Sequence, residues 1–294
     1  MKWQGVMPAI TTAFDAKLAI DHGFVAKHCA WLIDNGCTGI VTPGSLGEGA
    51  VLSLKEKIAL WTTCVKAVGK SVPVVAAISA LSTEEAVELA KHAADAGCKG
   101  LMVLPPYVYR GDWRETKAHI AAVLKATKLS CMLYNNPVAY GTDFLPEQIA
   151  ELAKEHSNLH SVKESSMDVR RITAIRSLCG DRLAVFVGVD DAIVEGVAAG
   201  AVGWIAGLAN AFPKESVALF EYAMRGEEKN AFELYSWFLP LLRMDTVPKF
   251  VQLIKLVQQE VGMGNARVRM PRMELAGQEL KDAMSIIKQS LKKL

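Results

Sequence analysis

The chain has 294 residues, of which 51% are hydrophobic and 22% charged, and its formal net charge is +2. This composition supplies a large apolar core and permits one large α/β domain or two small ones. Charged residues are scattered, without a basic block or an aromatic-interleaved patch, so we expect no nucleic-acid partner. No apolar run approaches the roughly 20 residues that span a bilayer, so we expect no membrane partner either.

The six cysteines indicate a reducing compartment. None belongs to a CxxC pair, and most lie in apolar segments, as is typical of buried free thiols in the cytoplasm. The chain enters a strand almost at once, without an apolar leader, so we expect a cytoplasmic protein. No spacing typical of zinc ligands is present, and we expect no metal site. The cysteines are Cys29, Cys37, Cys64, Cys98, Cys131 and Cys179.

Apolar strands alternate with helical segments from the first residues onward. Strands are predicted over 6–14, 39–42, 73–79, 100–104, 130–134, the segment that ends at Lys163, 183–189 and 201–208. Helices are predicted over 21–33, 53–69, 82–96, 112–126, 146–156, 168–178, 190–199 and 213–224. Ser53 with Glu56, and Ser82 with Glu85, have the spacing of capping boxes at helix starts.

Eight strand–helix units with short connections predict an α/β fold, a closed (β/α)8 TIM barrel, over residues 1–226. The strands are continuous apolar runs, which is typical of strands covered on both faces. An open doubly wound sheet is the alternative fold, although no GxGxxG follows the first strand. Residues 227–294 are predicted to form a helical C-terminal extension, with helices over 227–243, 247–261 and 273–294, packed on the barrel.

The predicted strand 159–163 ends in a lysine, Lys163. Burial of an ammonium group costs roughly several kcal/mol unless the group is paired or loses its proton. A lysine with a lowered pKa is a nucleophile at neutral pH, so we expect Lys163 to form a Schiff base with a carbonyl substrate. The alternative is a lysine that extends to solvent from the strand end.

Other polar residues follow neighbouring strands at the same predicted face of the barrel. Tyr134 can supply the proton transfers of a carbinolamine, and the hydroxyl of Ser45 can orient that phenol. Backbone amides of the glycine-rich turn 43–49 can hold a carboxylate. The alternatives are a turn residue for Ser45 and a core residue for Tyr134. His160 points to the other side of its strand and receives no role.

Several segments together resemble a known family. They are Gly44-Ser45-Leu46-Gly47-Glu48, Tyr134-Asn135-Asn136-Pro137, Val162-Lys163-Glu164, Gly188-Val189-Asp190-Asp191 and the run 200–213. With these segments in this order, the chain resembles the class I aldolase superfamily of dihydrodipicolinate synthase and N-acetylneuraminate lyase. The resemblance implies a (β/α) barrel with extra C-terminal helices, a homotetramer built as a dimer of dimers, and no metal or organic cofactor.

The resemblance also implies roles for individual residues. Lys163 would form the Schiff base with pyruvate or a longer 2-keto acid, and Tyr134 would be the acid/base. Ser45, with the backbone amides of Ser45 and Leu46, would bind the substrate carboxylate, and Ile205 would line the pocket through its backbone. Further substrate-binding residues are expected at Gly44, Gly47, Tyr107, Asn136 and Gly188.

The sequence departs from members that make dihydrodipicolinate at three positions. Leu46 stands where they have a second hydroxyl residue, and Val108 where they have a tyrosine that reaches the neighbouring subunit's site. Ala139 stands where they have an arginine that holds the aldehyde substrate's carboxylate. The turn and the Asn-Asn-Pro segment also differ from the usual form of sialic acid lyases.

We therefore expect a Schiff-base lyase of dehydratase, deaminase or aldolase type. The Asn-Asn-Pro and Gly-Ser-Leu-Gly forms resemble members that remove water or ammonia from deoxy-keto sugar acids or from a hydroxylated cyclic imine, which implies a substrate of that kind. One alternative is an authentic 4-hydroxy-tetrahydrodipicolinate synthase, which condenses pyruvate with aspartate semialdehyde. Arg110, or an arginine of a neighbouring subunit, in the pocket would favour it. The other is a catalytically silent ligand-binding barrel.

Overall fold

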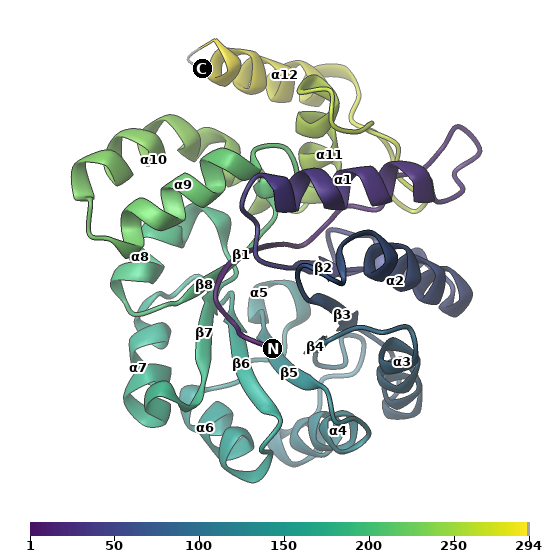
Figure 1. Cartoon of the computed structure of the whole chain (residues 1–294), viewed down its shortest axis with the longest axis vertical. Coiled ribbons are helices and arrows are strands. Elements are labelled where there is room, and N and C mark those ends of the chain that lie inside the picture. The colour runs from purple at the N-terminus through teal and green to yellow at the C-terminus, as the bar shows by residue number, and fades with distance from the viewer. Residues whose placement is uncertain (293–294) are drawn as a thin grey trace.

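Eight parallel strands form a barrel in the computed structural model, which describes residues 1–292 (Figure 1). Within that range the strands are β1 (Gly5–Pro8), β2 (Ile40–Thr42), β3 (Val74–Ile78), β4 (Gly100–Val103), β5 (Ser130–Asn135), β6 (Leu159–Glu164), β7 (Ala184–Val187) and β8 (Gly203–Ala206). Their order around the sheet is β1-β8-β7-β6-β5-β4-β3-β2, so each strand pairs with its neighbour in the chain.

The two ends of this order also meet. A parallel bridge joins Ala9, just after β1, to Val41 in β2, and the amide of Ile10 donates to the carbonyl of Val41 at 3.0 Å. This bridge closes the sheet, which confirms the TIM barrel and rules out the open doubly wound alternative. β1 is shorter than the predicted 6–14, because the amide of Thr11 donates to Asn210 Oδ1 and leaves the strand ladder.

Helices follow the strands and cover the outside of the barrel (Figure 1). They are α1 (His22–Asp34), α2 (Leu54–Val68), α3 (Thr83–Asp95), α4 (Trp113–Lys125), α6 (Pro146–Glu155), α7 (Arg170–Cys179), α8 (Ile193–Ala198) and α9 (Pro213–Met224). The Ser53–Glu56 capping box is complete. Ser82 accepts from the amide of Glu85, but the Glu85 carboxylate accepts from Leu81 rather than from Ser82.

One helix was not predicted from the sequence. It is α5 (Pro137–Tyr140), a single turn directly after β5. The side chain of Asn136 accepts from the amide of Ala139 and caps the turn, and Pro137 occupies its first position, where a missing N–H costs nothing. The consequence is that Tyr140 turns back towards the end of β5 instead of leaving along a loop.

Strand side chains alternate between two apolar layers. One layer lies between the strands and the helices, and the other fills the barrel interior with residues such as Met7, Met102, Met132 and Phe186. Tyr134 belongs to the interior layer, and Lys163 is its register partner on β6. Both side chains therefore emerge at the carboxyl ends of adjacent strands, where barrel enzymes place their reacting groups.

Three helices follow α9: α10 (Glu228–Leu242), α11 (Phe250–Glu260) and α12 (Gly277–Leu291). α10 packs beside α9, and α12 contacts both α10 and α11 (Figure 1). The predicted helix 273–294 begins later, at Gly277, and its last two residues lie outside the described residues. Within residues 1–292 we find no helix with both the length and the apolar character needed to cross a bilayer.

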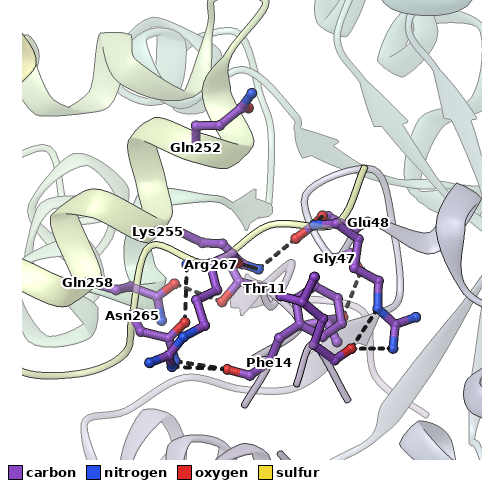
Figure 2. A network of polar contacts seen from close by, with 12 residues as sticks. Thr11, Phe14, Gly47, Glu48, Gln252, Lys255, Gln258, Asn265 and Arg267 are labelled. Atoms are coloured by element: carbon purple, nitrogen blue, oxygen red, sulfur yellow. Dashed lines mark hydrogen bonds and ion pairs between the residues drawn. The ribbon is translucent and has the colours of Figure 1, made fainter. Parts of the chain in front are cut away.

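A buried polar network joins α11 to the loops after β1 and β2 (Figure 2). The ammonium of Lys255 lies 2.6 Å from the Glu48 carboxylate, and it also donates to the carbonyl of Arg267 at 2.6 Å. The side chains of this ion pair are 2% and 0% exposed. Burial lowers the pKa of Lys255, and the neighbouring Glu48 carboxylate opposes that shift.

This ion pair fixes a segment that matters for the cavity described below. Glu48 is the next-to-last residue of the glycine-rich turn 43–49. Its backbone is left-handed, with φ of 56°, a conformation that residues other than glycine rarely adopt. Its second carboxylate oxygen accepts from the amide of Arg269 at 3.0 Å. The C-terminal segment thus holds the turn from its outer side.

Replacement of Lys255 by Met should destabilise the fold by about 3–5 kcal/mol, because the buried Glu48 carboxylate loses its partner. The measurement is the free energy of unfolding from urea denaturation followed by circular dichroism. Lys249→Met is the matched control, since Lys249 pairs with Glu279 on the surface and its removal should change stability little. Equal losses in the two variants would contradict a structural role for the buried pair.

Candidate active site

A cavity of about 460 Å³ opens at the carboxyl ends of the strands. Eight of the ten predicted site residues line it: Gly44, Ser45, Leu46, Tyr134, Asn136, Lys163, Gly188 and Ile205. Residues from the segments between the C-terminal helices complete the wall, among them Asp245, Thr246, Val247, Pro248 and Arg272. The glycine-rich turn, the ends of the strands β5, β6, β7 and β8, and the C-terminal segment therefore meet around one space.

Lys163 lies at the base of this cavity and does not extend to solvent. The residue is 7% exposed, and its Nζ lies 4.0 Å from the centre of the Tyr134 ring. Burial lowers the pKa of Lys163, while Tyr140, Asp245 and Asp190 oppose that shift. A desolvated amine with a lowered pKa is suited to attack a carbonyl carbon.

Gly188, just after β7, leaves room for the lysine. A Cβ atom at this position would lie 2.5 Å from Lys163 Cε and 2.0 Å from Ser165 Oγ, distances that real side chains do not reach. Any larger residue here would displace Lys163 from its place beside Tyr134.

The Tyr134 hydroxyl is held from the neighbouring loop. It accepts a hydrogen bond of 3.0 Å from Asn136 Nδ2, and burial raises the pKa of the phenol. Tyr134 therefore carries its proton in the resting site. The centre of its ring lies 4.0 Å from the Lys163 amine, the proposed nucleophile.

Ser45 contacts a second tyrosine, which sequence reasoning missed. Its hydroxyl is hydrogen-bonded to the hydroxyl of Tyr140, and the Tyr140 ring meets the Tyr134 ring edge to face at 5.7 Å. Burial raises the pKa of Tyr140 as well. The signal for this residue was the Asn136-Pro137 pair, which caps a helical turn and so carries position 140 back into the cavity.

Two predicted substrate-binding residues do not line the cavity. Tyr107 packs against the Tyr140 ring at 6.2 Å from outside the wall. Gly47 serves the turn itself: its carbonyl accepts from the Thr12 hydroxyl at 2.6 Å, and a Cβ there would lie 2.8 Å from the carbonyl oxygen of Ile10.

The three positions that depart from the dihydrodipicolinate-forming pattern differ in their surroundings. Leu46 is buried in the cavity wall, and Ala139 also lines it. Val108 is 75% exposed and lies outside the wall. Arg110 is not in the wall either, and the arginine found there is Arg272, from the C-terminal segment.

Two carboxyl groups act on Lys163, that of the buried Asp190 and that of the half-buried Asp245. Asp190 accepts hydrogen bonds from the Trp204 indole and from the amides of Gly207 and Leu208, and burial raises its pKa to about 6. Asp245 closes the turn after α10, and its Oδ1 is buried without a hydrogen-bond partner among the described residues. Sequence reasoning missed Asp245, because it follows no strand and lies in the helical segment.

The structure offers no ready metal site in the part of the chain that it describes. Over residues 1–292 no group of three or more His, Cys, Asp or Glu side chains is placed to hold a metal ion.

Comparisons with known proteins identify the family of the chain. The sequence model of the Dihydrodipicolinate synthetase family matches residues 2–290. The 4-hydroxy-tetrahydrodipicolinate synthase of Agrobacterium fabrum is 32% identical over 271 residues, 92% of each chain. That of Geotalea uraniireducens is 32% identical over 291 residues, 98% of each chain.

Solved structures resemble the whole chain. Dihydrodipicolinate synthase from Bacillus anthracis superposes with a TM-score of 0.93 at 27% identity, covering 98% of both chains. The chloride-inhibited dihydrodipicolinate synthase from Acinetobacter baumannii, crystallised with pyruvate, gives 0.93 at 28% identity, again with 98% of both chains covered. The protein is therefore a lyase that belongs to the dihydrodipicolinate synthetase family.

Proposed function

We propose that this protein is a Schiff-base lyase that acts on pyruvate or a longer 2-keto acid through an imine on Lys163. The observation that carries the proposal is the buried Lys163 amine 4.0 Å from the Tyr134 ring at the base of the cavity. The Acinetobacter baumannii relative was crystallised with pyruvate, which supports a keto acid as the ligand class.

The reaction begins with attack of the neutral Lys163 amine on the keto carbon, C2. The carbinolamine loses water when its oxygen takes a proton from Tyr134, which leaves a C2 iminium ion. Removal of a C3 proton then moves the C–H electron pair into a C2=C3 bond and neutralises the nitrogen as an enamine. The tyrosinate left by dehydration accepts the C3 proton and becomes Tyr134 again, while the 3.0 Å hydrogen bond from Asn136 Nδ2 holds its oxygen in place.

The glycine-rich turn is proposed to hold the substrate carboxylate. Ser45 lies in the wall together with Gly44 and Leu46, and the amides of Ser45 and Leu46 would donate to the carboxylate. Tyr140 would fix the Ser45 hydroxyl and continue the chain of phenol and hydroxyl groups away from Lys163. No metal or organic cofactor is needed for these steps in our proposal.

The enamine can lose a substituent from C4, as in a dehydratase or deaminase. Alternatively, the iminium ion can release an aldehyde by cleavage of the C3–C4 bond and become the enamine, as in an aldolase. We favour a deoxy-keto sugar acid or a hydroxylated cyclic imine as substrate. Leu46 and Ala139 line the cavity where dihydrodipicolinate-forming members are expected to have a hydroxyl residue and an arginine. Assembly as a tetramer of two tight dimers, and the division into residues 1–226 and 227–294, also remain proposals.

A second candidate function is 4-hydroxy-tetrahydrodipicolinate synthesis, the activity named for relatives at 32% identity. The observation in its favour is Arg272, which lines the cavity and would offer a cation to the carboxylate of aspartate semialdehyde. The buried pairing of Lys163 with Tyr134 speaks against a catalytically silent barrel.

Borohydride reduction after incubation with pyruvate should attach one pyruvate-derived adduct to Lys163, and Lys163→Ala should abolish both adduct and turnover. The site is located by mass measurement of the digested protein. Circular dichroism of Lys163→Ala checks that the fold remains. An adduct on another lysine, or full activity in the variant, would exclude the imine on Lys163.

The rate of imine formation should rise with pH and reach half its maximum below pH 10.5, the ordinary pKa of a lysine, because burial lowers the pKa of Lys163 and only the neutral amine attacks. The rate is measured as the initial formation of the reducible adduct over a series of pH values. A simple alkylamine with pyruvate provides the reference curve. Coincidence of the two curves would contradict a lowered pKa.

Tyr140→Phe should lower kcat by roughly 10–100-fold if the phenol supports proton transfer through Ser45, and should leave the amount of trapped pyruvate adduct close to wild type. Steady-state kinetics and adduct mass supply the two readouts. The control is Tyr222→Phe on α9, which lies outside the cavity wall and should behave as wild type. An unchanged kcat in Tyr140→Phe would remove this phenol from the mechanism.

A further inference from the structure

Part of the cavity wall is formed by residues to which the proposed function gives no role, among them Asp245. Asp245 lies in the cavity wall at the end of a short turn, Arg243–Asp245. Its Oδ1 is buried and makes no hydrogen bond to any residue that the structure describes. An unpaired buried oxygen disfavours the charged form of a carboxyl group, so this environment favours a protonated Asp245.

The surroundings of Asp245 contrast with those of its neighbour Asp190. Asp190 is fully used in the fold, with bonds from the Trp204 indole and from two backbone amides. Asp245 packs directly over Gly207, where a Cβ atom would lie 2.1 Å from Asp245 Oδ1. Gly207 therefore leaves space for the Asp245 carboxyl group, whose Oδ1 accepts no hydrogen bond from the described residues.

The position of Asp245 fits the part of a keto acid beyond C3. In the proposed function the carboxylate lies at the turn after β2, and C2 lies at Lys163 on β6. Gly207, under Asp245, follows β8, which is two strands from β6 and two from β2 around the barrel. The wall formed by residues 245–248 therefore lies to one side of the line from the Ser45 turn to Lys163, and a substrate chain that turns to this side beyond C3 meets Asp245.

We propose that Asp245 is a catalytic acid that protonates a hydroxyl leaving from C4 of the enamine, so that the site performs elimination of water rather than retro-aldol cleavage. This inference rests on the proposed Schiff-base function. The substrate class is a 3-deoxy-2-keto acid with a hydroxyl on C4.

The step balances within the site. The enamine nitrogen pair forms the C2=N bond, the C2=C3 pair moves to C3=C4, and the C4–O bond breaks with its electrons on oxygen. Asp245 gives its proton to that oxygen, which leaves as water, and the carboxylate later regains a proton from solvent. Retro-aldol cleavage requires the opposite transfer, removal of the C4 hydroxyl proton by a base.

The electrostatics of the site favour a donor at this position. Burial raises the pKa of Asp245, the carboxylates of Asp190 and Asp191 raise it further, and Lys163 lowers it. The acid therefore holds its proton beside a neutral enamine and releases it as positive charge returns to the Lys163 nitrogen. The titratable and charged groups around it are Lys163, Tyr134, Asp190, Asp191, Arg243 and Arg272.

The test compares wild type with Asp245→Asn, which keeps the size of the side chain but cannot donate this proton. Both C4 epimers of 2-keto-3-deoxypentonate are supplied. Elimination gives 2,5-dioxopentanoate and water, whereas retro-aldol cleavage gives pyruvate and glycolaldehyde. Exchange of the pyruvate methyl protons in D₂O, followed by NMR, reports imine and enamine formation without any leaving group.

We expect wild type to form 2,5-dioxopentanoate from one epimer. Asp245→Asn should lower that rate by roughly 10²–10⁴-fold, the usual contribution of a positioned acid, and keep pyruvate exchange within about threefold. Fluoride release from 2-keto-4-fluorobutanoate should fall far less, because fluoride leaves without a proton. Asp181→Asn, which removes an exposed carboxylate outside the cavity wall, is the matched control and should resemble wild type.

Three results would overturn the inference. The first is an unchanged elimination rate in Asp245→Asn, and the second is an equal loss of elimination and of pyruvate exchange in that variant. The third is a wild type that exchanges the pyruvate protons but forms no 2,5-dioxopentanoate from either epimer, whether it yields pyruvate and glycolaldehyde or no product. If Asp245→Asn does not fold, Asp245→Ser and the wild-type products decide the matter. Failure of the Schiff-base function itself looks different, since wild type would then show neither exchange nor a borohydride adduct.

Discussion

Burial of the Lys163 amine is the constraint around which the site is built. An ammonium group in an apolar barrel interior costs free energy, and the surrounding residues reduce that cost without placing a salt-bridge partner on it. The Tyr134 ring lies 4.0 Å away, and the carboxyls of Asp190 and Asp245 act through space. Gly188 leaves the lysine its room. The amine remains accessible only from the cavity, and its pKa stays low enough for attack on a carbonyl.

The helical segment after α9 contributes to the site as well as to the fold. Lys255 on α11 holds Glu48 in a buried ion pair, and Glu48 belongs to the same turn as Ser45 (Figure 2). The turn before α11 brings Asp245 into the cavity wall. A change in α11 therefore affects the proposed carboxylate-binding turn on one side and the far wall of the cavity on the other.

Much of the site was accessible from the sequence because parallel strands of a barrel end on one face. Once β5 and β6 were predicted, Tyr134 and Lys163 had to emerge side by side, and the turn with Ser45 had to face them. Tyr140 was missed because its place depends on a single helical turn capped by Asn136, too short for a periodic pattern. Tyr107 was placed in the site by resemblance, but it packs behind Tyr140 because that ring occupies the wall.

The sequence by itself determined the barrel, the order of its strands and the side on which Lys163 lies. These follow from continuous apolar runs, capped helices and the alternation of side chains along a strand. Only the tertiary structure decided which distant residues complete the cavity. Asp245, Arg272 and the Lys255–Glu48 pair come from helices whose periodic pattern shows which face is buried but not what that face meets. Contacts between segments about 200 residues apart are set by packing, and no local pattern in either segment specifies them.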